Sequence, residues 1–478
     1  MKLPDEFLSR TGTQLCPNEF GAFLASYRHP PVRGIRFNRL KTSEDLARHV
    51  LPIIIKPKQV PWCREGYSFI DDARLSKHIM YHAGLFYIQE PSAMCPVEVL
   101  EPLPGERVLD LCAAPGGKSV QIAGHMNGRG LLVSNDRSAS RCRGLVRNIE
   151  LAGARNVVVL SEDPTKLAAR FPLFFDRVLV DAPCSGEGMF RRDKDMSAAY
   201  AKNKPEKCQS LQKELLYLAA KMLGPGGCMV YSTCTFNRAE NEDVVEDFLA
   251  RNSVFRLGQI NHQALGVERS DYGIRIWPHK SDAEGHFAAL LINRGEGRHS
   301  LMQEQAGAKE SFAFLPCKSG EGNFQKQDRA CVTYGKPPLE FAAFMDEHLL
   351  PDRHGLEGYL ATYGENLYLL PEPLNLDRLR VARSGLHLGT LRKGRFVPSQ
   401  ALALALFQDS CVHKADLSFE DAARYLKGES IPWEAFPGGG KPWVHVCCMG
   451  LPLGFARYVN RRLKNCLPRG WVGEIVGI

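Results

Sequence analysis

Residues 107–118 read RVLDLCAAPGGK, an apolar run that passes directly into a turn with two adjacent glycines. The run from Arg107 to Cys112 predicts a β-strand, and a helix is expected after Lys118. Glycine lets the backbone approach a ligand closely, because no Cβ is in the way. A strand, a glycine turn and a helix in this order are typical of the ligand-binding edge of an open α/β sheet.

The same alternation of β-like runs and helical stretches continues to residue 251 and predicts an α/β fold, a parallel sheet with covering helices. Further strands are expected at residues 130–136, 156–160, 176–181 and 228–232. A turn is expected at Gly224-Pro225-Gly226-Gly227. A helix is expected from Asn237 to Ala250, because its early acidic residues favour a helix N-terminus.

Asp136 ends the second run, 26 residues after Asp110. A carboxylate in this position typically accepts hydrogen bonds from the ribose hydroxyls of a nucleoside cofactor. NAD-dependent enzymes share this arrangement, but the turn lacks the GxGxxG pattern and no pyrophosphate-binding pattern accompanies it. The sequence therefore favours S-adenosylmethionine, which carries no phosphate.

Two other apolar runs end in cysteine motifs, Asp181-Ala182-Pro183-Cys184 and Thr233-Cys234. Open α/β sheets bind ligands at the carboxyl ends of their strands, so both thiols are expected beside the cofactor. A thiolate that adds to C6 of a pyrimidine turns C5 into a carbon that can attack a methyl donor. A second polar group can then assist release of the product. The pair therefore predicts methylation of C5 of a cytosine in RNA.

The chain has 478 residues and fifteen cysteines, most of which are expected to be ordinary core residues. There is no CxxC pair, and the adjacent Cys447 and Cys448 are too isolated to indicate a metal site, so no structural zinc is expected. No run approaches the roughly 20 apolar residues that span a membrane. We expect a cytoplasmic, multidomain protein with no metal, no membrane contact and no obligate protein partner.

The chain resembles the RNA cytosine-C5 methyltransferases of the RsmB/RsmF family. The resemblance rests on an ordered set of motifs: CAAPGGK at 112–118, Asp136, Asp163, DAPCSGEG at 181–188, YSTCT at 231–235 and Glu240-Asn241-Glu242. It implies a class I S-adenosylmethionine-dependent methyltransferase core, which is Rossmann-like. It also implies a cofactor pocket lined by Cys112, Ala113, Ala114, Pro115, Gly116, Gly117, Lys118, Asp136, Asp163 and Asp181.

The resemblance also implies roles for the two thiols, with Cys234 as the nucleophile and Cys184 as the group that helps to release the product. A rival assignment makes Cys184 the attacking thiol, because DNA cytosine-C5 enzymes use the cysteine of a Pro-Cys motif. Lys118 is the local cation that could favour a thiolate. Asp181 could bind the N3/N4 edge of the cytosine.

Asp163 has an acidic neighbour, Glu162, and this stretch could also be a plain helix start. Residues 284–287, EGHF, resemble the closing hairpin of the fold, and we assign His286 no catalytic role. The segment from Arg33 to Lys41 resembles the arginine-asparagine element of the family's N-terminal RNA-binding region.

Segments at 383–389 and 398–404 resemble an appended PUA-like, β-rich RNA-binding domain. The expected organisation is an N-terminal RNA-binding region, a catalytic methyltransferase domain, a linker, a small intermediate module and the PUA-like domain. Their respective bounds are 1–95, 96–294, 295–312, 313–379 and 380–478.

The net charge of +8 is concentrated near the C-terminus. Residues 380–478 hold 14 Lys and Arg against 7 Asp and Glu, with the densest part from Arg457 to Lys464. Cations mixed with an aromatic are typical of a phosphate-contacting surface, although a solvated charged face has the same composition.

The expected activity is S-adenosylmethionine-dependent methylation of C5 of a cytosine in 16S ribosomal RNA, within the small ribosomal subunit. The resemblance implies the decoding region. A duplex hides the faces of its bases, so the target must be unpaired or flipped. The alternatives are the same chemistry on tRNA or another rRNA site, and a ribosome-assembly protein that binds RNA without catalysis. A Rossmann oxidoreductase has no sequence support beyond the fold.

Overall fold

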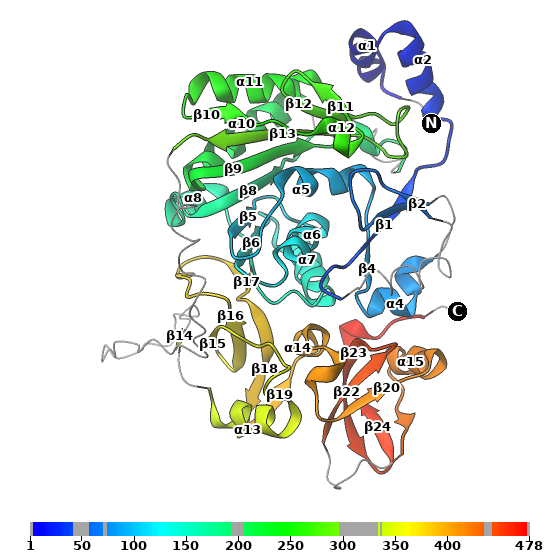
Figure 1. Ribbon diagram of the computed structural model, residues 1–478, viewed down its shortest axis with the longest axis vertical. Coiled ribbons are helices and arrows are strands. Elements are labelled where there is room, and N and C mark those ends of the chain that lie inside the picture. Colours follow the sequence, from blue (N-terminus) through cyan, green and yellow to red (C-terminus); the bar gives the residue numbers. More distant parts are fainter. Residues whose placement is uncertain are drawn as a thin grey trace.

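The structure, a computed structural model, describes residues 3–41, 57–69, 74–192, 200, 205–295, 333–334, 337–434 and 442–475. The predicted linker at 295–312 lies outside these residues, apart from Gly295. A large α/β unit occupies the upper part of the view in Figure 1, and two smaller β-rich units lie below it. Within the described ranges, no helix has both the length and the apolar character needed to cross a membrane.

The N-terminal region consists of a helical pair and a small antiparallel sheet. The pair is α1 (Asp5–Gln14) and α2 (Pro17–Ser26). The sheet has the order β2-β3-β1-β4, with bounds β1 Arg33–Phe37, β2 Lys58–Gln59, β3 Gly66–Phe69 and β4 Phe86–Ile88. The short helix α4 (Ile79–His82) lies between β3 and β4, and α5 (Cys95–Leu100) leads into the central sheet.

The arginine-asparagine element of this region is largely buried. Arg36 donates a 2.9 Å hydrogen bond to the Gly117 carbonyl, and Asn38 donates a 2.8 Å hydrogen bond to the Ala152 carbonyl. Both side chains are almost fully covered. These two residues therefore fasten the N-terminal sheet to the α/β unit and do not face solvent.

The central sheet confirms the predicted α/β fold. Its ten described strands have the order β11-β12-β13-β9-β8-β5-β6-β7-β17, with β10 paired to β13. The pairing is parallel from β9 through β8, β5 and β6 to β7. The elements in chain order are β5 Arg107–Asp110, α6 Gly117–Met126, β6 Leu131–Asn135, α7 Ala139–Leu151, β7 Val157–Leu160, α8 Pro164–Arg170, β8 Phe175–Asp181, α10 Pro205–Met222, β9 Leu223–Thr233, α11 Glu242–Arg251, β10 Phe255–Leu257, α12 His262–Leu265, β11 Glu268–Ser270, β12 Gly273–Ile276 and β13 His286–Asn293.

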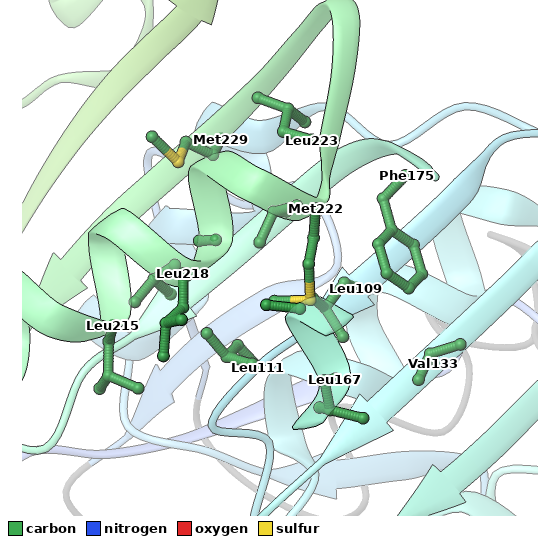
Figure 2. Packing of buried hydrophobic residues seen from close by; sticks show 14 of the residues in the cluster. Leu109, Leu111, Val133, Leu167, Phe175, Leu215, Leu218, Met222, Leu223 and Met229 are labelled. Carbon is green, nitrogen blue, oxygen red and sulfur yellow. The ribbon is translucent and has the colours of Figure 1, made fainter. Parts of the chain in front are cut away.

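Helix α10 packs against the strands at the centre of the sheet. Leu215, Leu218 and Met222 recur at helical spacing and share a buried cluster with Leu109 of β5 and Met229 of β9 (Figure 2). Burying one such side chain contributes roughly 1.5–3 kcal/mol. Strand β8, which ends just before the Pro-Cys motif, contributes Val178 and Val180 to the same cluster and is therefore firmly packed.

The prediction of a turn at residues 224–227 is wrong. Strand β9 begins at Leu223, which pairs with Phe175 of β8. The register then shifts, so that Arg177 pairs with Cys228. Residues 224–227 therefore form an irregular part of β9, with paired residues before and after them.

The helix expected from Asn237 is divided. A 3-10 turn covers Arg238–Glu240, and α11 begins only at Glu242. Between them, the Asn241 side chain accepts a 2.5 Å hydrogen bond from the Thr233 hydroxyl. It also donates a 2.9 Å hydrogen bond to the carbonyl of residue 235. These bonds hold the backbone in a non-helical conformation that sequence propensity did not predict.

Two β-rich units follow. The first sheet has the order β14-β15-β16-β18-β19 and the second β20-β22-β23-β24-β21. Strand β17 instead pairs with β7 at the edge of the central sheet. The first sheet includes strands on both sides of residue 380, where the sequence predicted a domain boundary. The elements are β14 Thr333–Tyr334, α13 Leu339–His348, β15 Tyr359–Tyr363, β16 Asn366–Leu370, β17 Val381–Arg383, β18 Leu386–Arg392, β19 Arg395–Pro398, α14 Gln400–Ala405, β20 Lys414–Asp416, α15 Phe419–Leu426, β21 Ile431–Pro432, β22 Trp443–Cys448, β23 Leu451–Val459 and β24 Arg462–Asn465.

Candidate active site

The two cysteine motifs lie at the ends of neighbouring parallel strands. Asp181, the last residue of β8, pairs with Ser232 near the end of β9. The loops that follow carry Cys184 and Cys234, whose Sγ atoms lie 3.4 Å apart. Both side chains are partly exposed. The structure thus brings together the two thiols that the sequence located at strand ends.

Hydrogen bonds hold the two cysteine loops against each other. The Gly188 N–H donates to the Cys234 carbonyl over 2.9 Å. A Cβ at Gly188 would lie 2.9 Å from the same oxygen, so the close approach needs glycine. Ser185, next to Cys184, shares a 2.9 Å hydroxyl hydrogen bond with Thr235, next to Cys234. Each cysteine is therefore fixed through its own neighbour.

Glu240 is a buried carboxylate that braces the Cys184 loop. It accepts hydrogen bonds from the Ser185 N–H at 2.9 Å, the Ser185 hydroxyl at 2.5 Å and Gln212 of α10 at 3.0 Å. Burial raises the pKa of Glu240, and these hydrogen bonds counteract only part of the effect. Glu240 belongs to the Glu240-Asn241-Glu242 motif, but the motif alone indicated no role for it.

Glu187 connects the site to the N-terminal helices, which lie at the top of Figure 1. One oxygen accepts from the Phe236 N–H at 3.0 Å, and the other accepts from Arg10 of α1 at 3.0 Å. Phe23 of α2 also packs edge-on against Phe236, with ring centroids 5.4 Å apart. This connection was not predictable from the sequence, because no local pattern indicates a contact between residues 177 positions apart.

Three side chains converge on the Asp181 carboxylate. Lys118 donates to Oδ2 at 2.8 Å, and Ser232 donates to Oδ1 at 2.8 Å. His286, to which the sequence analysis gave no catalytic role, has its Nε2 3.5 Å from Oδ1. Burial acts to raise the pKa of Asp181, but Lys118 and His286 outweigh it and hold that pKa well below its ordinary value. Asp181 is therefore an anion at neutral pH, and its side chain is 28% exposed, enough for a ligand to reach it.

The Cys234 and Cys184 thiols have different electrostatic surroundings. Burial acts to lower the pKa of Lys118, but Asp181 and the negative charge of a Cys234 thiolate raise it above its ordinary value. Lys118 is therefore a cation within electrostatic range of Cys234. The pKa of Cys184 lies well above its ordinary value because of its hydrogen bond with Cys234, its burial and the nearby negative charges. Cys184 thus keeps its proton at neutral pH.

The glycine turn of residues 112–118 lies beside the acid that ends β6. Gly116 has φ 113°, a conformation that favours glycine. A Cβ at Gly117 would lie 3.0 Å from a neighbouring aromatic ring. Arg141 of α7 donates to the Ala114 carbonyl at 2.5 Å and lies 3.0 Å from Asp136 Oδ2. The turn and Asp136 are therefore held together in the arrangement expected of a cofactor site.

Burial distinguishes Asp163 from its acidic neighbour. Glu162 is fully buried and accepts hydrogen bonds from the backbone of Arg380 at 3.1 Å and from its side chain at 3.2 Å. Asp163 caps α8 through the Thr165 N–H at 2.9 Å, and its side chain is 36% exposed. Asp163 can therefore reach a ligand, whereas Glu162 joins the catalytic unit to the segment before β17.

Four family models match consecutive parts of the chain. The N-terminal domain of 16S rRNA methyltransferase RsmF matches residues 3–91, and 16S rRNA methyltransferase RsmB/F matches residues 97–292. The first C-terminal domain of the RsmF rRNA methyltransferase matches residues 343–406, and the methyltransferase RsmF PUA domain matches residues 412–472.

Solved structures resemble about three fifths of the chain. A methyltransferase homolog protein from Pyrococcus horikoshii is 29% identical with a TM-score of 0.51, over 61% of this chain and 100% of that chain. NSun6 from the same organism, solved with SFG, is 24% identical with a TM-score of 0.54, over 62% of this chain and 99% of that chain. The second likeness shows the fold alone.

Curated relatives extend over the whole length. Ribosomal RNA small subunit methyltransferase F of Enterobacter sp. (strain 638) is 32% identical over 489 residues, covering 98% of this chain and 96% of the relative. The protein of the same name from Escherichia coli O6:H1 is 32% identical over 485 residues, covering 98% and 97%. These findings confirm the resemblance drawn from the motifs. The chain belongs to the RsmB/F family of 16S rRNA methyltransferases, as an RsmF-type, S-adenosylmethionine-dependent cytosine-C5 enzyme.

Proposed function

We propose that this enzyme methylates C5 of one cytosine in the decoding region of 16S rRNA, through a covalent bond between Cys234 Sγ and C6 of the base. The observation that carries the proposal is the pair of thiols 3.4 Å apart, on loops that follow the Asp181 carboxylate and its strand neighbour. Two thiols and one anion at adjoining strand ends match the groups that this reaction requires.

Cys234 is the nucleophile in this proposal. The Lys118 cation stabilises a thiolate there, and the Cys184 S–H can donate a hydrogen bond to it. The S–C6 bond forms as the C5–C6 double bond opens, which gives C5 the electron pair that takes up the methyl group.

Cys184 assists the release of the product. After methyl transfer the C5 proton must leave, so that the double bond re-forms and the S–C6 bond breaks. The raised pKa of Cys184 keeps its proton in place, so its S–H can donate to the Cys234 sulfur as that sulfur leaves C6, while the C5 proton passes to solvent water. The rival assignment, with Cys184 as the attacking group, would require the thiol with the raised pKa to ionise first.

Asp181 would bind the N3/N4 edge of the cytosine. Its two oxygens are already oriented by Lys118 and Ser232, so little reorganisation is needed when the base arrives. The 4-amino group of cytosine donates to a carboxylate, whereas the 4-carbonyl of uracil would repel it. Asp181 therefore also favours cytosine over uracil.

The chain fits S-adenosylmethionine in the region between the glycine turn and the acids that follow β6 and β7. Residues 112–118 and Asp181 would line the pocket, Asp136 would bind the ribose hydroxyls, and Asp163 would approach the adenosine. When bound, S-adenosylmethionine supplies the methyl group.

The C-terminal units would hold the RNA around the target in the small ribosomal subunit, in the cytoplasm. In the predicted basic stretch, Arg461, Arg462 and Lys464 are exposed, and Arg457 stacks on Trp443 at 4.9 Å. Exposed cations on a PUA domain suit phosphate contacts. The curated relatives are named as methyltransferases of small-subunit ribosomal RNA, which favours 16S rRNA over tRNA as the target.

A denaturing gel tests both the chemistry and the thiol roles. Wild type, Cys184→Ala and Cys234→Ala are each incubated with S-adenosylmethionine and small-subunit particles. We expect an RNA-linked band in Cys184→Ala alone, and 5-methylcytosine in the decoding region with wild type. A band in Cys234→Ala alone would exchange the two roles. Methylation of tRNA but not of the particles would support the alternative target. A wild type that binds S-adenosylmethionine but methylates neither RNA would support a non-catalytic assembly role.

A further inference from the structure

His286 lies where the two cysteine loops and Asp181 meet. It is the first residue of β13, and the next residue, Phe287, pairs with Thr233 directly before Cys234. The imidazole is 4% exposed, and its Nε2 lies 3.5 Å from Asp181 Oδ1. This distance is at the outer limit of a hydrogen bond, and such contacts in enzymes tighten when the transition state forms.

The His286 ring has hydrogen-bonding capacity that its surroundings leave unused. Apart from the long contact with Asp181, neither ring nitrogen meets a hydrogen-bond partner in the part of the chain that the structure describes. Burial lowers the pKa of His286, and the attraction of Asp181 does not restore it. The ring is therefore neutral at neutral pH, with one N–H donor and one acceptor. Burying a polar ring without hydrogen-bond partners costs free energy of folding, and a hydrogen bond to a neighbouring group would offset that cost.

A hydrogen bond from the His286 N–H would orient the Asp181 carboxylate. Lys118 holds Oδ2 with a charged hydrogen bond, on a flexible side chain that can shift with the carboxylate. Ser232 donates to Oδ1 through a hydroxyl that can rotate. The His286 ring is rigid and enclosed, so a hydrogen bond from it would define the plane of the carboxylate.

We propose that His286 is a positioning residue, whose Nε2–H donates to Asp181 Oδ1 during catalysis and fixes the carboxylate in the orientation that binds the cytosine. The inference rests on the proposed function, in which Asp181 contacts the base. No bond is made or broken at the ring. Loss of one hydrogen bond to a charged group corresponds to about ten-fold or more in rate.

Three substitutions in the full-length enzyme test the role. His286→Phe keeps a ring but removes the donor. His286→Gln retains an amide N–H at about the position of Nε2, and His286→Asn is one carbon too short to bring its amide there. With small-subunit particles as substrate, we expect kcat to fall about ten-fold or more in His286→Phe and His286→Asn. We expect His286→Gln to recover most of it, with the KM values for S-adenosylmethionine and RNA nearly unchanged. In a Cys184→Ala background, His286→Phe should slow formation of the covalent adduct.

A purely structural role makes different predictions. If His286→Phe turned over like wild type, or if Gln were as impaired as Asn while both bound S-adenosylmethionine normally, the inference would be overturned. Comparing Gln with Asn decides the matter even if the Phe variant does not fold. Failure of the proposed function is seen separately, because wild type itself would then form no 5-methylcytosine.

Discussion

Replacing Glu240 by alanine should loosen the Cys184 loop without disturbing the cofactor side of the site. The carboxylate contacts Ser185, which adjoins Cys184, and Gln212 of α10. None of these residues belongs to the glycine turn of residues 112–118. We therefore expect loss of methylation with S-adenosylmethionine affinity retained.

The size of the effect follows from the donors that remain. After the carboxylate is removed, the Ser185 hydroxyl can still bond to Thr235, and Gln212 keeps one N–H on the Pro183 carbonyl. The Ser185 N–H and the second N–H of Gln212 are left buried without an acceptor. Each such group costs about 1–3 kcal/mol, so the loop should lose about 2–6 kcal/mol of local stability.

The matched control is Glu240→Gln. Its amide oxygen can accept from the Ser185 and Gln212 N–H groups, and its NH2 can donate to the Ser185 hydroxyl oxygen. Only the charge of the hydrogen bonds is lost, which should cost about 1 kcal/mol. This variant should therefore keep most of the activity.

Hydrogen exchange of a peptide that covers residues 183–190 measures the effect directly. A loss of 2 kcal/mol or more corresponds to exchange at least about 30-fold faster in Glu240→Ala, and the Gln variant should differ from wild type by less than about ten-fold. Should the Ala variant exchange and methylate as wild type does, Glu240 is not the brace of this loop.

Three further predictions have defined outcomes. Burial raises the pKa of Asp110 to about 7, so the folded state holds a proton that the unfolded chain releases near pH 4. The stability from this proton is complete below about pH 4 and is lost as the pH rises through 7. Asp110→Asn should abolish this decline, measured as the thermal unfolding temperature against pH. An unchanged pH dependence would contradict the raised pKa of Asp110. Asp163→Asn should weaken S-adenosylmethionine binding about ten-fold in calorimetry, because about one charged hydrogen bond is lost. Glu162→Gln should leave the affinity unchanged. Equal effects of the two substitutions would refute the distinction between these acids by burial. Arg10→Met leaves Glu187 buried without its cation, so protease cleavage of the N-terminal helices should accelerate and methylation should fall together, and full methylation would exclude the connection.

The catalytic fold was predictable because buried parallel strands appear in sequence as continuous apolar runs. The four residues of β7, Val157–Leu160, are all buried, and the sequence run matches the strand within one residue. Strand β17 was not predictable in the same way. It has only three residues, and its partner Leu160 lies more than 200 positions earlier, so no local periodicity indicates the pairing. Its place in the central sheet is decided by tertiary contacts.

In the candidate site, too, some residues were predictable from local sequence and others depend on tertiary contacts. Motif residues such as Cys184 and Cys234 directly follow strands, so strand prediction also located them at one edge of the sheet. Adjacent acids such as Glu162 and Asp163 cannot be distinguished by spacing, because only burial decides which of them faces a ligand. His286 was dismissed as a lone histidine in a hairpin, and its contact with Asp181 depends on the pairing of β13 with β9.

The two flanking regions of the chain each support a different half of the reaction. Arg10 of the N-terminal helices neutralises Glu187, which in turn holds the loop of Cys234, the thiol that we propose to attack the base. Arg380, which lies between β16 and β17, neutralises Glu162 beside Asp163, the acid that we propose to approach the cofactor. Both carboxylates are almost fully buried, and a buried charge without its partner costs several kcal/mol. The catalytic unit therefore depends electrostatically on both of its neighbours, so that parts of the chain outside the methyltransferase motifs also maintain the geometry of the thiols and of the cofactor site.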